Sequence, residues 1–227
     1  MVNIRFLRHG KIILFFIFYF YPLFSVSVYA QPLQPVRIHY GGGGDWYGNK
    51  TTWINILRKV RSDLGMDTAE RETVARILDA DFIRYPIAYI AGHGNIVFTD
   101  EEASALRKYL ESGGFLYADD DYGMDKSFRR EMKKVFPELN FVELPFSHPI
   151  YHIYYSFNQG LPKIHEHAGG PPKGFGLIYR GRLVCFYSYN TDISDGCEDA
   201  QIHNDPPEVR QSALKMAVNI LLYAVLN

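Results

Sequence analysis

The sequence of 227 residues predicts one α/β domain in which helices cover both faces of a mostly parallel sheet. Continuous apolar runs of strand length alternate along the chain with segments that have helical spacing. Glycine or aspartate directly follows three of these runs, as expected where a strand ends in a tight connection. No linker is long enough to divide residues 31–227, so we expect a single domain there.

The first thirty residues have the three parts of a secretory signal peptide. Arg5, Arg8 and Lys11 supply positive charge, residues 12–24 form an unbroken apolar run, and small residues end the segment at residues 28–30. We therefore expect cleavage after this segment and export to the periplasm or the extracellular space. The alternative is an uncleaved segment that anchors the protein in the inner membrane, because its weakly polar end could extend the apolar run to a spanning length.

The part of the chain after the predicted cleavage point is mildly acidic. The whole chain has 24 Lys and Arg against 25 Asp and Glu, and three of the basic residues but none of the acidic ones precede Gln31. This leaves 21 basic against 25 acidic residues, without a basic stripe for a phosphate backbone, so nucleic acid is not an expected partner. We expect an envelope protein or a small ligand, and membrane contact only if the first segment stays uncleaved.

The sequence contains two cysteines, Cys185 and Cys197. They could form a disulfide in an oxidising compartment. Cys185, however, lies inside the apolar run of residues 183–189, where a buried free thiol is common. The sequence leaves both states open.

The first half of the predicted domain alternates strands with helices. Strands are predicted at residues 36–40, 86–91 and 115–118, helices at residues 53–64, 99–112 and 126–136, and residues 73–78 are a strand or a helix end. The run at residues 86–91 is continuously apolar, which indicates a central strand buried on both faces. Thr51 or Thr52 is the predicted N-cap of the first helix, and Thr99 with Glu102 predicts a capping box at the second.

The second half is less regular. Residues 140–174 are rich in Pro, Gly, His and Tyr and show little periodicity, so loops with short elements are expected. Residues 176–179 and 182–189 predict a hairpin with a two-residue turn. Helical spacing returns at residues 207–226.

Several short motifs, in a fixed order, resemble the domain of unknown function family 4159 (DUF4159). They are Tyr40-Gly41-Gly42-Gly43, Asp45-Trp46, Tyr85-Pro86, Gly92-His93-Gly94, Phe98-Thr99 with Glu102, Gly113-Gly114-Phe115-Leu116, Asp119-Asp120, His148-Pro149-Ile150, Gly181-Arg182-Leu183 and Asp192. The resemblance covers residues 36–227. It implies a relation to the class I glutamine amidotransferase-like superfamily, and with it a flavodoxin-like three-layer α/β/α sandwich. No established reaction accompanies the resemblance.

The sequence lacks the motifs that a glutaminase needs. Such an enzyme presents its cysteine in a Gly-x-Cys-x-Gly turn between strand and helix and completes the site with His-x-Glu, and neither pattern occurs here. The turn after residues 115–118 carries aspartates instead. We therefore expect a catalytically silent domain that acts as a ligand-binding or interaction module in the cell envelope.

Carboxylates and an imidazole follow several predicted strands. Because parallel strands end at the same edge of a sheet, we expect these side chains to lie around one crevice. They could bind a hard cation or act as acid and base, and the alternative is that they cap helices and close turns. An enzyme of this type would be a metal-dependent or acid/base hydrolase that uses Asp120 and His93. The candidate ligand-binding residues are Asp45, Trp46, His93, Asp119, Asp120 and Asp192, with Asp121 beside them.

Two further segments contain residue types that can bind metal or phosphate. Among the later histidines His148, His152, His165 and His167, the pair His148 and His152 has the spacing of one helical turn, which zinc accepts. The glycines at residues 41–44 do not match either nucleotide-binding fingerprint, so a turn is expected there. We predict no resident cofactor, although the carboxylates could accept a divalent metal ion.

Overall fold

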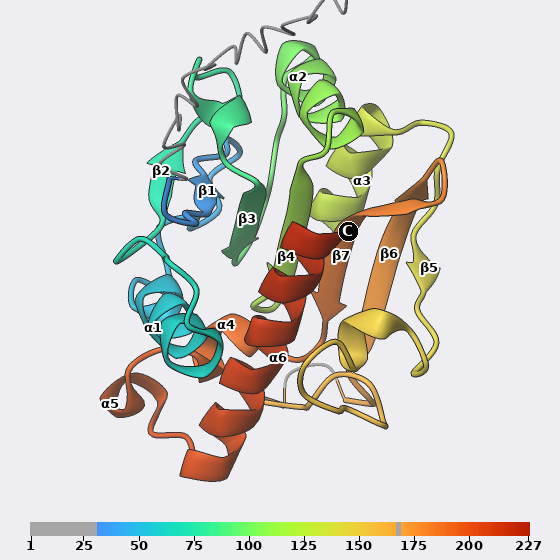
Figure 1. Cartoon of the computed structure of the whole chain (residues 1–227). Coiled ribbons are helices and arrows are strands. Elements are labelled where there is room, and N and C mark those ends of the chain that lie inside the picture. Colours follow the sequence, from blue (N-terminus) through green and yellow to red (C-terminus); the bar gives the residue numbers. More distant parts are fainter. Residues whose placement is uncertain (1–30, 167–168) are drawn as a thin grey trace, which may run out of the picture. The chain divides into compact units, whose positions relative to one another are not determined.

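Seven strands form one mixed sheet in the order β2-β1-β3-β4-β7-β6-β5 (Figure 1). The computed structural model describes residues 31–166 and 169–227, so the predicted signal segment at residues 1–30 lies outside the described residues. The strands are β1 (Val36–Ile38), β2 (Thr73–Ala75), β3 (Ile87–Gly92), β4 (Phe115–Asp120), β5 (Val142–Glu143), β6 (Lys173–Tyr179) and β7 (Arg182–Tyr189). Pairing is parallel from β2 through β7 and antiparallel in the β7-β6-β5 part.

The two central strands, β3 and β4, are buried along their whole length. This confirms the prediction of a strand covered on both faces, made from the continuous apolar run. β4 extends two residues beyond the predicted end, through Asp119 and Asp120. The last two residues of the strand are therefore acidic. Because successive side chains of a strand point to opposite faces of the sheet, these two side chains point to different faces.

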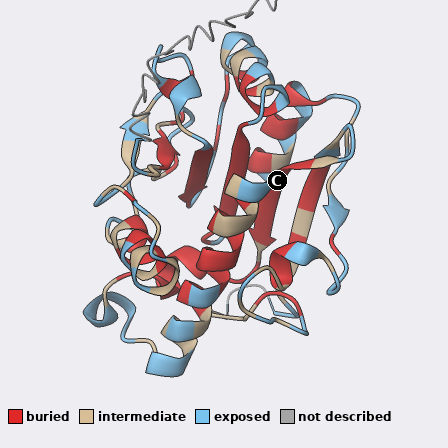
Figure 2. Cartoon of the chain, viewed as in Figure 1, coloured by how far each residue is buried: buried red, intermediate tan, exposed pale blue. Residues whose placement is uncertain are grey.

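Helices cover both faces of the sheet, as Figure 2 shows by burial. The helices are α1 (Thr52–Leu64), α2 (Asp100–Glu111), α3 (Asp125–Val135), α4 (Ile193–Gly196), α5 (Ala200–His203) and α6 (Pro207–Leu226), with short 3-10 turns at Phe82–Arg84 and Pro149–Tyr151. α1 and α6 pack with Tyr89 and Tyr117 in one apolar cluster. α2 and α3 pack with Ala88 and Leu116 in the other. The described residues thus form three layers, α/β/α.

The capping box predicted at α2 is present. The Thr99 hydroxyl accepts a hydrogen bond from the Glu102 amide at 3.1 Å, and the Glu102 carboxylate accepts one from the Thr99 amide at 2.8 Å. At α1, Thr51 is the N-cap residue, as predicted, but its side chain makes no capping hydrogen bond. Its hydroxyl instead accepts from the Asp199 amide at 3.0 Å, and Thr52 donates to the Ser194 carbonyl at 2.6 Å. Both threonines therefore join the start of α1 to the segment that contains α4.

Thr99→Ala should lower the free energy of unfolding by about 1 kcal/mol, because the variant leaves helical amides without a capping acceptor. Urea unfolding followed by circular dichroism measures the change. Ser104→Ala, on the exposed face of the same helix, is the matched control and should change stability by only a few tenths of a kcal/mol, roughly. Equal losses in the two variants would contradict the capping role.

The β6–β7 hairpin has the predicted two-residue turn. Arg180 and Gly181 occupy it with φ of 49° and 82°, the positive values that a tight hairpin turn requires. Cys185 lies in β7 and Cys197 follows α4, and both are buried free thiols. They belong to the apolar clusters on opposite faces of the sheet, which explains why they do not pair.

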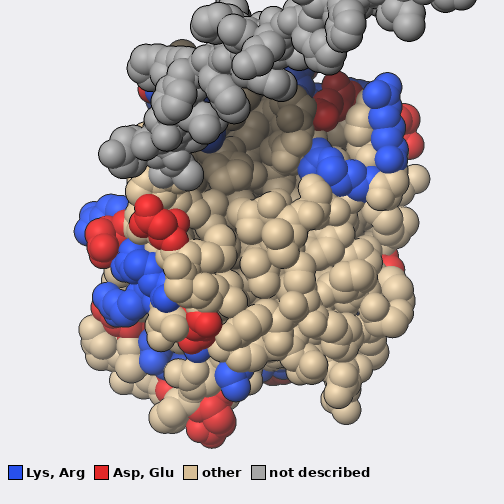
Figure 3. Space-filling model, viewed as in Figure 1, with Lys and Arg blue, Asp and Glu red and all other residues tan. Residues whose placement is uncertain are grey.

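The face crossed by α6 carries few charges over its centre (Figure 3). Lys and Arg side chains gather at the left edge of this view, where Asp and Glu side chains lie between them. No continuous basic band is visible among the described residues of this face.

Candidate functional site

The carboxyl ends of β1, β3, β4 and β7 lie at one edge of the sheet, and unusual backbone conformations gather in the loops that follow. Four non-glycine residues there have positive φ, namely Asn49, Tyr122, Asn190 and Asp192. Asn and Asp tolerate this conformation because their short side chains can hydrogen-bond locally. A tyrosine does so rarely, and Tyr122 has φ of 97°. Such strain is concentrated at functional sites.

Asp45 and His93 meet at this edge. One Asp45 carboxylate oxygen accepts from the His93 amide, and the other lies 3.1 Å from His93 Nδ1. Gly92 has φ of 128°, and a Cβ at this position would lie 2.7 Å from Asp45 Oδ1. The loops after β1 and β3 also bind each other, since the Val97 amide donates to the Gly41 carbonyl at 2.9 Å. Gly41 and Gly92 therefore allow the two loops to approach each other closely, which supports the interpretation of Gly41 as a turn residue.

Asp119 is buried between two serines. One oxygen accepts from Ser188 Oγ, and the other accepts from the Ser194 amide at 2.6 Å and from Ser194 Oγ at 2.5 Å. Burial raises the pKa of Asp119 to about 7, with a further contribution from Asp192, while the serine hydrogen bonds oppose the rise. The Ser194 hydroxyl also lies 2.6 Å from the Tyr89 hydroxyl. The network joins β3, β4, β7 and α4.

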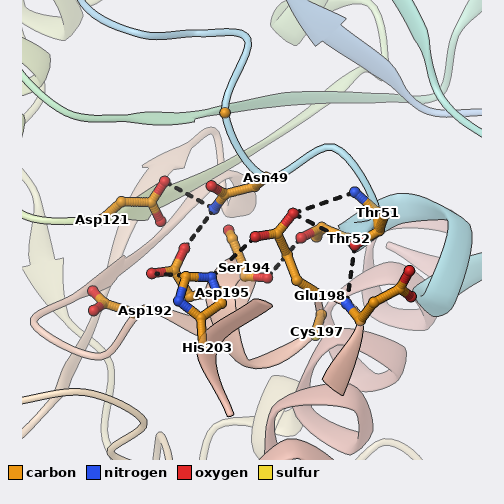
Figure 4. Close-up of polar contacts among 12 residues, drawn as sticks. Asn49, Thr51, Thr52, Asp121, Asp192, Ser194, Asp195, Cys197, Glu198 and His203 are labelled. Atoms are coloured by element: carbon orange, nitrogen blue, oxygen red, sulfur yellow. Dashed lines mark hydrogen bonds and ion pairs between the residues drawn. The ribbon is translucent and has the colours of Figure 1, made fainter. Parts of the chain in front are cut away.

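Asp121 is a second buried carboxyl of this edge. Burial raises its pKa well above the usual value, and the nearby acidic groups, Asp119 first, raise it further. Asp121 Oδ2 accepts from Asn49 Nδ2 at 3.0 Å, whereas Oδ1 is buried without a hydrogen-bond partner. The same Asn49 amide donates to Asp195 Oδ1 at 2.9 Å (Figure 4). Asn49 therefore links two carboxylates from distant parts of the chain.

Arg37 fixes the loop that carries Asn49. Its buried guanidinium donates to the carbonyls of Trp46, Gly48 and Asn49 at 3.2, 2.9 and 2.9 Å and binds Glu72 at 3.0 Å. The ring of Trp46 lies on His39, with ring centroids 4.0 Å apart. Among the described residues, no Lys or Arg forms an ion pair with the buried aspartates Asp119, Asp121 and Asp195.

His165 contacts two aspartates of this edge, and Asp205 as well. Its Nδ1 lies 3.1 Å from Asp192 Oδ2 and 3.4 Å from Asp195 Oδ2, and its Nε2 lies 3.0 Å from Asp205 Oδ1. The contacts with Asp192 and Asp195 raise the pKa of His165 to about 10, although burial opposes this. His203 completes the group.

His203 Nε2 lies 3.8 Å from Asp195 and 3.0 Å from Glu198. Five residues of this group were not predicted as site residues from the sequence, namely Asn49, Asp195, Glu198, His203 and Asp205. The spacing of Asp192, Asp195 and Glu198 is a signal that could have found part of this set, because residues three apart share one face of a helical segment.

Asp120 is turned away from the buried aspartates. It lies between Asp119 and Asp121 in sequence, and its Oδ1 accepts from the amides of Tyr122 and Met124, both at 3.3 Å. Burial raises its pKa. A hollow of about 370 Å³ adjoins it. The hollow is lined by Asp120, Tyr122, Gly123, Asp125, Lys126, Tyr189 and Asn190.

The family model described as Domain of unknown function (DUF4159) matches residues 35–225. The chain belongs to this family. A search of the curated proteins found no match.

In this DUF4159 domain, His148 and His152 serve local contacts. His148 Nδ1 accepts from the Ile150 amide at 3.2 Å, and His152 Nε2 lies 2.7 Å from the Phe146 carbonyl. The His, Cys, Asp and Glu residues of the described chain that lie close enough to share a metal ion are His165, Asp195 and His203. The predicted pair is therefore not the group that the structure assembles.

Neither thiol of the DUF4159 domain is exposed at this edge. Burial raises the pKa of Cys185 and of Cys197 well above the usual value for a thiol. A cysteine nucleophile reacts as the thiolate, which such burial disfavours. The chemistry available at the edge is that of carboxylates, imidazoles, hydroxyls and side-chain amides.

Proposed function

We propose that this domain is a binding module that holds a small polar ligand in the hollow beside the β4–α3 turn. We further propose a flavodoxin-like fold of the class I glutamine amidotransferase-like type, because the order β2-β1-β3-β4-β7 corresponds to the flavodoxin order 2-1-3-4-5. In such sheets ligands bind beyond the carboxyl ends of the strands. The composition of residues 1–30 supports a place in the cell envelope.

The observation that carries this proposal is the conformation of Tyr122. The residue keeps a φ of 97° and a largely exposed side chain at the turn between β4 and α3. The ring belongs to neither of the two apolar clusters. Strain kept at a turn that lines a hollow is typical of a ligand-binding position. The volume of about 370 Å³ also falls in the range of small-molecule sites.

The side chains around the hollow suit a ligand with several hydroxyl or amine groups, such as a saccharide. Asp120 and Asp125 offer acceptors, Lys126 offers a donor, and Tyr122 and Tyr189 supply aromatic surface. Aromatic rings beside carboxylates bind the apolar faces and the hydroxyls of sugars together.

A hydrolase built on Asp120 and His93 has less support. The Asp120 side chain accepts from two backbone amides at the start of α3. His93 is held by Asp45 instead. The geometry thus favours binding over acid/base chemistry by this pair.

Tyr122→Gly should abolish binding without loss of stability, because glycine adopts positive φ freely. We expect an equal or higher melting temperature, together with at least tenfold weaker binding. The measurement is calorimetric titration of the full chain with neutral and amino mono- and disaccharides.

Tyr47→Ala is the matched control, because Tyr47 is another exposed tyrosine and lies outside the hollow. This variant should bind as the wild type does. Failure of every saccharide to bind wild-type protein would overturn the ligand class, and unchanged binding by Tyr122→Gly would overturn the site.

A further inference from the structure

We propose that His165, Asp195 and His203 form a binding site for a divalent transition metal ion of the zinc class. One nitrogen or oxygen from each of these residues lies within 4.8 Å of the other two. The site shares no residue with the hollow beside Tyr122, so it goes beyond the proposed ligand-binding function and is independent of it.

The distances suit a tetrahedral ion. His165 Nδ1 lies 3.4 Å from Asp195 Oδ2, and His203 Nε2 lies 3.8 Å from the same oxygen. With bonds of about 2.0–2.1 Å, two ligands of one tetrahedral zinc are about 3.3 Å apart. These two distances are within about 0.5 Å of that spacing. The two imidazole nitrogens lie within 4.8 Å of each other, so they can approach further when an ion binds. Two imidazoles and one carboxylate are also a ligand set that zinc accepts readily.

Neighbouring groups orient the three ligands. Asp205 Oδ1 lies 3.0 Å from His165 Nε2. If the neutral imidazole carries its proton on Nε2 and donates it to Asp205, the lone pair of Nδ1 is available to the ion. Metal-bound histidines commonly donate their second nitrogen to a carboxylate in this way. Asn49 holds Asp195 Oδ1 at 2.9 Å, which turns Oδ2 toward the histidines. Figure 4 shows Asn49, Asp195 and His203 converging from separate segments.

A fourth ligand is available from either side of the group. Glu198 Oε2 lies 3.0 Å from His203 Nε2, and Asp192 Oδ2 lies 3.1 Å from His165 Nδ1. Either carboxylate, or a water molecule, can complete four-coordination. The structure therefore supplies more oxygen donors around the two imidazoles than the ion needs.

The negative charge of the carboxylates around the three ligands also favours a bound cation. Asp121 Oδ1 and Asp205 Oδ2 are buried side-chain oxygens without a hydrogen-bond partner. Asn49 connects Asp121 to the ligand Asp195. Burying carboxylates is costly unless a positive charge compensates them, and a divalent ion at Asp195 would stabilise the whole group.

The test is a zinc titration of tag-free full-length protein that has been treated with a chelator and dialysed. Calorimetry should show one Zn²⁺ bound per chain, and Co²⁺ should give the absorption bands of a tetrahedral complex. Zinc should also raise the melting temperature, since an ion that binds only the folded state stabilises it.

His203→Ala should weaken zinc binding at least tenfold. His203 is partly exposed on the short helix α5, so its loss leaves the core intact. His152→Ala is the matched control, because His152 binds only the Phe146 carbonyl and should bind zinc as the wild type does. Asp205→Asn should weaken binding less than His203→Ala, because Asp205 acts through His165.

Three results would overturn the site. The first is wild-type protein that does not bind one Zn²⁺ per chain, in which case protonated His165 would be the positive charge that pairs with the carboxylates. The second is equal zinc binding by His203→Ala and His152→Ala, and the third is preference for Mg²⁺ or Ca²⁺ over Zn²⁺. None of them bears on saccharide binding at Tyr122, so the two proposals fail separately.

Discussion

Asn49→Asp should lower the free energy of unfolding by about 3 kcal/mol or more at pH 8, because it leaves two buried carboxylates without their donors. The variant replaces the amide that binds Asp121 and Asp195 with a third negative charge. Aspartate has nearly the same shape and tolerates positive φ, so the backbone of the loop is unaffected. Chemical unfolding of the variant and the wild type at one pH measures the difference.

The loss in Asn49→Asp should become smaller as the pH falls. Burial and neighbouring acids already raise the pKa of Asp121, and a further carboxylate raises it more. A carboxyl with a raised folded-state pKa binds protons more tightly when folded, so its cost to stability grows as pH rises through that pKa. Asn49→Gly removes the donors without adding charge, and its loss should change less with pH. Parallel pH profiles for the two variants would refute the electrostatic explanation.

Arg37→Met should destabilise the domain by about 3–5 kcal/mol, the usual cost of removing one partner from a buried ion pair. The variant leaves Glu72 and three backbone carbonyls without their donor. It also removes the cation that lies 4.9 Å from the centre of the Tyr89 ring. Thermal unfolding and urea unfolding both report the change.

Two further variants complete the experiment on Arg37. Arg37→Lys keeps the charge but not the fork-shaped donor set, so we expect an intermediate loss. Arg84→Met is the surface control, because Arg84 is 77% exposed in its pair with Asp81 and should change stability by less than about 0.5 kcal/mol. An Arg37→Met variant as stable as this control would show that the loop is held by other contacts.

The sheet and its main helices could be predicted because their signals are local. The apolar run of β3, the capping box of α2 and the Arg180-Gly181 turn each depend on a few consecutive residues. The side-chain cap expected at α1 does not form, because Thr51 and Thr52 bind residues more than 140 positions away. Short-range patterns contain no information about such a partner.

The candidate site was predictable only in part for a similar reason. The rule for strand ends placed Asp119 and Asp192 at one edge, and there the charge of Asp192 helps to raise the pKa of Asp119. From the sequence, Asp119, Asp120 and Asp121 were expected to form one group. β4 runs through Asp120, however, and successive side chains of a strand point to opposite faces, which separates Asp120 from Asp119. His165 lies in a segment without periodicity, and backbone bonds to Thr191 bring it to the aspartates.

The lengths of the outermost strands, β2 and β5, limit how another protein can attach to this domain. β2 has three residues and β5 has two, so each border of the sheet offers few free amides and carbonyls to an incoming strand. At the β5 border, Lys173 and Glu143 form a charged pair, which further opposes strand addition. A protein that binds this domain would therefore contact loop side chains, and extension of the sheet between chains is disfavoured.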